Sequence, residues 1–119
     1  MTEITKEARY DAAIAQKEAG NLEAAIEMLE SLCADFPEYA LPHAALSMIY
    51  SRLDAHVPAL DHAAIVCELE PEDPFSFVAM SALAIKSGNR EAAEEALGKA
   101  RMAQLKYLQA QTSNNETDG

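Results

Sequence analysis

The chain has 119 residues, a formal net charge of −11, and hydrophobic residues at 50% of its positions. This length is enough for one domain with its own core. The excess of negative charge argues against nucleic acid and anionic membrane surfaces as partners, since both attract basic patches. No stretch approaches the roughly 18 apolar residues of a membrane span. The first ten residues lack the apolar segment of an export signal, so we expect a cytoplasmic protein.

Helices are predicted along nearly the whole chain. The first covers Lys6–Glu18 and ends at Gly20, a residue that readily takes the left-handed conformation found after helices. Asn21 is a good cap for the second helix, which Pro37 ends. The remaining predicted helices cover about 41–53, 57–69, 74–86 and 90–111. No Gly or Pro stops the last helix where the earlier ones stop, and residues 112–119 are predicted to be a disordered polar tail.

The sequence repeats with a period of 34 residues. The pair Gly20-Asn21 recurs as Asp54-Ala55 and as Gly88-Asn89, between the two helices of each predicted pair. The same interval separates Ala25, Ala59 and Ala93, and it relates Pro37 to Pro71 and to Leu105. A fixed period of this length is typical of stacked supersecondary units, each of which buries its apolar face against its neighbours.

The chain resembles the tetratricopeptide repeat family on these residues. The family pattern has an aromatic residue, Leu-Gly and Tyr in a first helix, then Ala, an aromatic residue and Pro in a second. At these positions the second repeat has His43, Leu46-Ser47, Tyr50, Ala59, Ala63 and Pro71, so it keeps the Leu, Tyr, Ala and Pro and departs from the pattern at the others. The resemblance implies an all-α, right-handed superhelical array of three helix-turn-helix repeats, six helices with an extended last helix. The repeats are about 6–39, 40–73 and 74–107, within one domain of residues 1–111.

In this family the first helices of the repeats line a concave groove. Transferring that geometry predicts a partner-binding groove formed by Tyr10, Ile14, Leu41, Ala45, Met48, Phe75, Val78, Ala79 and Ala82. The best-known members grip the C-terminal carboxylate of heat-shock chaperones with Lys, Asn and Arg. None of the corresponding residues here is basic or an amide, so we reject the C-terminal tail of a chaperone as the ligand.

Two surfaces are therefore candidates for binding. Residues 40–51 and 74–85 contain no Asp, Glu, Lys or Arg. Either the last helix covers these apolar helices, or they expose a surface that binds a partner segment or a second copy. A further apolar stripe lies near the end of the last helix. It either caps the third repeat or mediates self-association, and it comprises Met102, Leu105, Tyr107 and Leu108.

Residues that carry out chemistry do not form a recognisable motif. His43, His56 and His62 are not spaced as ligand pairs, so no metal, cofactor or catalytic site is predicted, and His62 is interpreted as a surface residue. Cys33 and Cys67 occupy the same place in consecutive repeats, where neighbouring helices lie too far apart for a disulfide. We expect two buried, reduced thiols.

The sequence favours a non-enzymatic interaction adaptor that binds a protein or peptide with an apolar segment. The carboxylates Glu68, Glu70, Glu72 and Asp73 are a solvated charge run or, alternatively, meet a basic edge of that partner. Two alternatives remain: a small assembly chaperone that shields an aggregation-prone subunit, and a self-assembling structural unit, which would make the chain a homo-oligomer.

Overall fold

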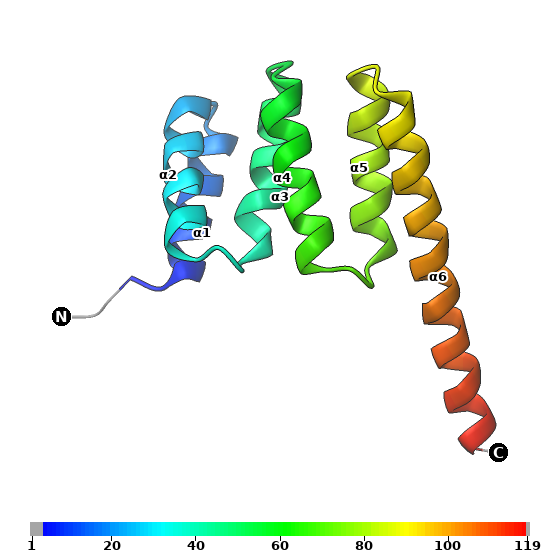
Figure 1. Ribbon diagram of the computed structural model, residues 1–119. Helices are drawn as coiled ribbons and strands as arrows, with labels where there is room; N and C mark the ends of the chain where they lie inside the picture. The colour runs from blue at the N-terminus through cyan, green and yellow to red at the C-terminus, as the bar shows by residue number, and fades with distance from the viewer. Residues whose placement is uncertain (1–3, 119) are drawn as a thin grey trace. The chain divides into compact units, whose positions relative to one another are not determined.

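The computed structural model describes the backbone of residues 4–118 and the side chains of residues 4–112, and these residues form six α-helices (Figure 1). Adjacent helices form helix-turn-helix pairs, as the sequence predicted. In chain order they are α1 (Lys6–Glu18), α2 (Leu22–Asp35), α3 (Ala40–Arg52), α4 (His56–Leu69), α5 (Pro74–Lys86) and α6 (Arg90–Asp118). No helix of the described part of the chain is long and apolar enough to cross a membrane.

The three turns inside the helix pairs share one backbone geometry. Gly20 and Gly88 have φ angles of 88° and 80°, and Asp54 takes the equivalent left-handed conformation with a φ of 58°. In each turn the next residue donates its amide hydrogen to a carbonyl five residues earlier, over 2.9 Å, 2.9 Å and 2.8 Å in chain order. This pairing satisfies carbonyls that the end of a helix leaves without partners. The period of 34 residues is therefore the period of a structural turn.

Caps fix the starts of three helices. The Thr5 hydroxyl accepts a hydrogen bond from the Ala8 amide at the start of α1, over 3.1 Å. The Asp73 carboxylate accepts one from the Phe75 amide over 3.0 Å, and Asn89 accepts one from the Ala92 amide over 3.0 Å. Such side-chain caps each stabilise a helix by about 1 kcal/mol.

The chain forms two compact units, residues 1–66 and residues 67–119. In the first unit, apolar side chains of α1, α2 and α3 form one core, in which Leu29, Leu32, Leu46 and Ile49 are fully buried. Each such side chain contributes about 1.5–3 kcal/mol relative to an exposed one. Arg9 of α1 adds a 2.9 Å ion pair with Asp35 of α2, at the surface of this core.

In the second unit, α5 packs against α6 through small residues. Phe77 is buried together with Cys67, Ala100 and Ala103, and Met80 packs against this group. Alanine at these positions of α6 lets the two helices approach closely. The small residues predicted at the crossing of each helix pair are buried in the same way: Ala25, Ala59 and Ala93.

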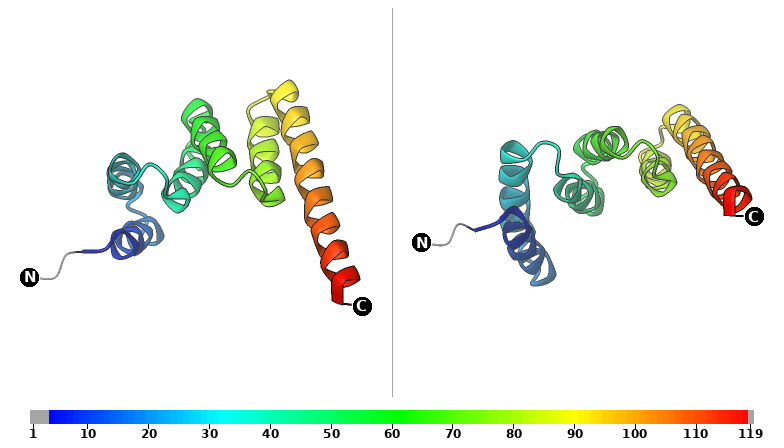
Figure 2. Two further views of the ribbon diagram at one scale, coloured as in Figure 1. Left: turned by 60° about the horizontal axis from the view of Figure 1, so that its bottom comes forward. Right: turned by 90° about the horizontal axis from the view of Figure 1, so that it is seen from below.

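The structure differs from the sequence prediction at the C-terminal end. Residues 112–119 were expected to be disordered, but α6 continues through Asp118, and Gly119 lies outside the described residues. Neither Gly nor Pro interrupts residues 112–118, and the Thr112 hydroxyl bonds to the Leu108 carbonyl of the preceding turn. As a result the C-terminal part of α6 extends past the start of α5 (Figures 1 and 2). The grouping of all three pairs into one domain, and the handedness of their array, stay predictions.

Candidate functional site

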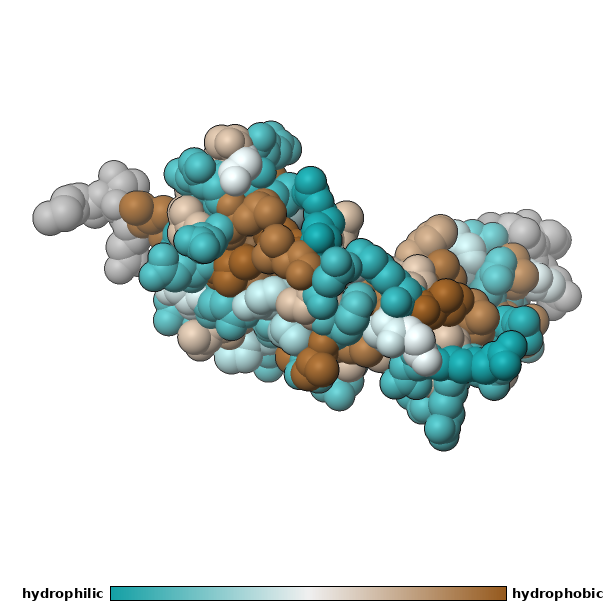
Figure 3. All heavy atoms as spheres, turned by 90° about the horizontal axis from the view of Figure 1, so that it is seen from above, coloured by the Kyte–Doolittle hydropathy of each residue, from teal (hydrophilic) through white to brown (hydrophobic). Residues whose placement is uncertain are grey.

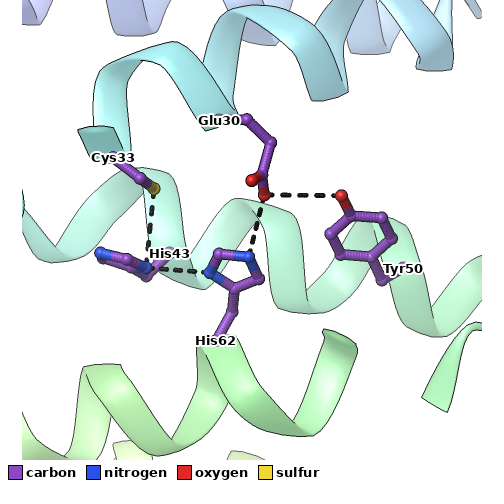
Figure 4. Close-up of polar contacts among 5 residues, drawn as sticks. All are labelled: Glu30, Cys33, His43, Tyr50 and His62. Atoms are coloured by element: carbon purple, nitrogen blue, oxygen red, sulfur yellow. Dashed lines mark hydrogen bonds and ion pairs between the residues drawn. The ribbon is translucent and has the colours of Figure 1, made fainter. Parts of the chain in front are cut away.

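Polar side chains from three helices converge inside the first unit. Glu30 and Cys33 lie on α2, His43 and Tyr50 on α3, and His62 on α4 (Figure 4). We call these five residues the histidine cluster. Glu30 and Cys33 are three positions apart, which places them on one face of α2. His62 lies three residues after the buried Ala59 and one before the buried Ala63, so α4 turns its ring inward.

Hydrogen bonds connect the cluster in a row. The Nε2 atom of His62 lies 2.9 Å from Oε1 of Glu30, and its Nδ1 atom lies 2.9 Å from Nδ1 of His43. That nitrogen of His43 is also 3.5 Å from the sulfur of Cys33. Tyr50 stacks on His62 with ring centroids 5.9 Å apart, and its hydroxyl donates to Glu30 over 3.4 Å.

The row constrains where the imidazole protons lie. Because a carboxylate only accepts hydrogen bonds, Nε2 of His62 carries a hydrogen and donates it to Glu30. A neutral His62 then has an unprotonated Nδ1, which accepts from Nδ1–H of His43. The Nε2 atom of His43 is left buried with no hydrogen-bond partner among the described residues. An unpaired buried polar atom of this kind is costly and calls for an explanation.

The contact between Cys33 and His43 does not form an activated nucleophile. Burial, and to a smaller extent the charge of Glu30, raises the pKa of the Cys33 thiol to about 11. Catalytic cysteines have pKa values lowered by neighbouring cations, the opposite effect. Burial and the neighbouring His62 ring lower the pKa of His43, so this ring is neutral near pH 7 and supplies no such cation. What the cluster does offer is one thiol and two imidazoles, a set of donors for a metal ion.

The cluster corrects two sequence interpretations. His62 was interpreted as a surface residue, but its side chain is only 14% exposed and bonds to two neighbours. Both cysteines are free, and Cys67 is buried as expected, whereas Cys33 is only half-buried. The spacing of ligands within one helix gives no signal for this cluster, because its members lie on three helices. The one available signal was that Cys33 and His43 flank the turn at Pro37, where α2 and α3 approach each other.

A second candidate site is the apolar face of α5, which we define as Phe75, Val78, Ala79, Ala82 and Ile85. These residues are exposed, and the largest of them, Phe75, Ile85 and Val78, are 79%, 63% and 49% exposed. The buried residues of α5 lie on another stripe of the helix, which α6 contacts. Among the described residues α6 therefore does not cover the apolar face. Figure 3 shows that apolar side chains reach the molecular surface in patches bordered by polar ones.

The groove residues predicted in the first unit are placed differently from one another. Leu41 and Met48 of α3 are exposed, as a binding surface requires. Tyr10 and Ile14 of α1 are half-buried and pack against the core. Ala45 is only 8% exposed and belongs to the core, which corrects its assignment to the groove. It points inward because α3 buries residues on nearly all sides, including its polar Ser47 and Ser51.

A cleft of about 520 Å³ lies beside the apolar face, where α5 begins. Its wall combines the apolar rings of Phe75 and Tyr107 with the carboxylates of Glu72 and Asp73. Asp73 already accepts hydrogen bonds from the Phe75 amide and the Ser76 hydroxyl. A long basic side chain matches this lining, since its aliphatic part would pack on the rings while its charge met the carboxylates.

The stripe predicted near the end of the last helix is also exposed. Met102, Leu105, Tyr107 and Leu108 all reach the surface of α6, and Tyr107 also lines the cleft. If these residues capped the third repeat, the chain itself would have to cover their side chains. The exposure of all four side chains does not agree with that interpretation. Their self-association stays a prediction.

Two solved structures share this fold. The chain superposes on the crystal structure of MamA, a tetratricopeptide repeat protein, with a TM-score of 0.79 over 89% of its length, at 21% sequence identity. A second crystal structure of the MamA protein gives a TM-score of 0.80, again over 89% of this chain at 21% identity. The chain spans 62% and 58% of the lengths of these two structures. No protein-family profile and no characterised protein matches the sequence. The likeness confirms the expected tetratricopeptide-like fold.

Proposed function

We propose that the chain is a non-enzymatic interaction adaptor that binds a protein or peptide segment on the apolar face of α5. The observation that carries the proposal is the exposure of Phe75, Val78 and Ile85 on a helix with no charged residue before Lys86. Exposed apolar surface of this kind is typical of interaction sites. Leu41 and Met48 provide similar exposed positions on α3.

The charge distribution indicates the chemistry of the partner. The loop before α5 carries Glu70, Glu72 and Asp73, and two of these carboxylates line the cleft beside Phe75. The chain as a whole has a net charge of −11. We therefore expect a segment with apolar side chains along its length and a Lys or Arg at the end that meets the cleft. The charges would raise the rate of association and fix the orientation of the segment.

The test uses Val78→Glu with a panel of synthetic peptides. An amphipathic apolar–basic peptide should bind the wild-type chain, and the same peptide with Glu in place of Lys should bind more weakly. Burying an unpaired glutamate in the contact costs about 3 kcal/mol or more, so Val78→Glu should weaken binding at least 100-fold. Its helicity and melting temperature should stay unchanged, because the position is exposed and Glu is at least as good a helix former as Val.

Val57→Glu is the matched control, since Val57 is an exposed valine on α4. It adds the same charge and should leave peptide binding unchanged. Equal binding by wild type and Val78→Glu, measured by fluorescence polarisation, would overturn the proposal, as would unfolding of Val78→Glu. Growth in size with concentration, lost on changing Leu105 to Glu, would instead favour the self-assembling unit. A single stoichiometric partner that is unstable alone would favour the assembly chaperone.

A further inference from the structure

We propose that Cys33, His43 and His62 of the histidine cluster bind one zinc ion. Their donor atoms all lie within 4.8 Å of one another, on three helices of the first unit. Thiolate sulfur and imidazole nitrogen are the ligands that zinc takes in proteins, whereas magnesium and calcium prefer oxygen. This site is independent of the adaptor function proposed above, because it uses none of the residues of the apolar face.

The distances fit a tetrahedral ion. Bonds of about 2.3 Å to sulfur and 2.0–2.1 Å to nitrogen place tetrahedral ligands about 3.6 Å apart for sulfur and nitrogen, and about 3.3 Å apart for two nitrogens. The sulfur of Cys33 lies 3.5 Å from Nδ1 of His43, the two Nδ1 atoms lie 2.9 Å apart, and the donor atoms of Cys33 and His62 lie within 4.8 Å of each other. Small rotations of the three side chains would therefore bring them into position, with water as the fourth ligand.

The surrounding hydrogen bonds favour the ion. Glu30 accepts a hydrogen bond from Nε2–H of His62. The lone pair on Nδ1 of that ring can therefore bind a metal. A carboxylate that orients a metal-binding histidine in this way is a frequent feature of zinc sites. The ion would also replace the proton that His43 and His62 share, so that both Nδ1 lone pairs would be satisfied. His43 would then carry its hydrogen on Nε2, so the ion would satisfy the two Nδ1 atoms but would not give this buried Nε2 atom a partner.

The position of the site indicates what it does. Cys33 lies on α2 of the first helix pair, whereas His43 and His62 lie on α3 and α4 of the second pair (Figure 4). A zinc ion would link the two pairs, and ligands that bind only the folded state stabilise it. Zinc would therefore stabilise the packing of α2 against α3 and α4.

The experiment uses the full chain, reduced and treated with a chelator that is then removed. Titration with Zn²⁺ against a chromophoric competitor should show one equivalent bound, and Mg²⁺ should not compete. Co²⁺ should give the intense visible bands of a tetrahedral site and a thiolate-to-cobalt charge-transfer band. Cys33→Ser should lose the charge-transfer band and at least 100-fold in zinc affinity, whereas Glu30→Ala should keep the band and lose about 10- to 100-fold.

The chain supplies two matched controls. Cys67→Ser removes the cysteine at the same position of the next repeat, and His56→Ala removes a histidine of α4 outside the cluster. Both should bind zinc as the wild type does. Circular dichroism verifies that each variant is folded. The proposal is overturned if the reduced wild-type chain binds no equivalent of zinc at micromolar concentration, or if folded Cys33→Ser binds zinc as tightly as Cys67→Ser does.

Discussion

Asp54 is the one non-glycine residue of the described chain in the left-handed region, with a φ of 58°. Gly20 and Gly88 occupy the equivalent positions in the other two turns, with φ angles of 88° and 80°. A side chain with a Cβ atom is less stable than glycine in this conformation, by about 1 kcal/mol. We therefore predict that the chain with Gly at position 54 is about 1 kcal/mol more stable than the chain with Ala there.

Comparing Asp54→Gly with Asp54→Ala isolates the backbone effect, because both variants lack the contacts of the aspartate side chain. The reverse changes, Gly20→Ala and Gly88→Ala, should each destabilise the chain by about 1 kcal/mol. Nothing lies within 4 Å of the Cβ that either change would add, so no steric clash contributes to this value. Urea denaturation measures the free energies of unfolding, and 1 kcal/mol corresponds to roughly 3–6 °C in melting temperature. Equal stability of the two Asp54 variants would refute the shared turn geometry.

The packing and thiol predictions can be checked on the same purified chain. Ala59→Leu should lower the free energy of unfolding by about 1–3 kcal/mol, because Ala59 is fully buried in α4 and a larger side chain overpacks the site. An unchanged thermal melt would contradict this packing. Cys67 should react slowly with a thiol reagent until urea unfolds the chain, since burial raises its pKa and reduces the thiolate fraction at a given pH. Rapid labelling of native Cys33→Ser, in which Cys67 is the remaining thiol, would contradict that burial.

The helices were predictable from the sequence because local signals mark their ends. Gly20, Gly88 and Pro37 have conformational preferences that act wherever they occur, and the repeat placed Asp54 in the same role. The end of α6 was not predictable in this way, since residues 112–118 contain neither Gly nor Pro. The polarity of these residues predicts a disordered tail, although polar residues can also continue a helix.

The histidine cluster was not predictable because its members come from separate helices. His43 lies 10 residues from Cys33 and 19 from His62 along the chain. Motifs for metal sites describe ligands close together in sequence, whereas these meet only after α2, α3 and α4 pack. The sequence also did not predict which of the groove residues on α3 are exposed. The apolar sequence of α3 does not show that Ala45 belongs to the core while Met48 reaches the surface.

The two proposals can fail separately, because they use different residues. Zinc binding depends on Cys33, His43 and His62 in the first unit, and peptide binding depends on Phe75 and Val78 in the second. Val78→Glu should therefore bind zinc with the affinity of the wild type. Peptide binding by zinc-loaded and zinc-free protein then shows whether the metal acts beyond its own unit. Equal peptide affinities would limit its role to stabilising the first unit, and different affinities would make zinc a regulator of the adaptor, with reciprocal coupling of the two ligands.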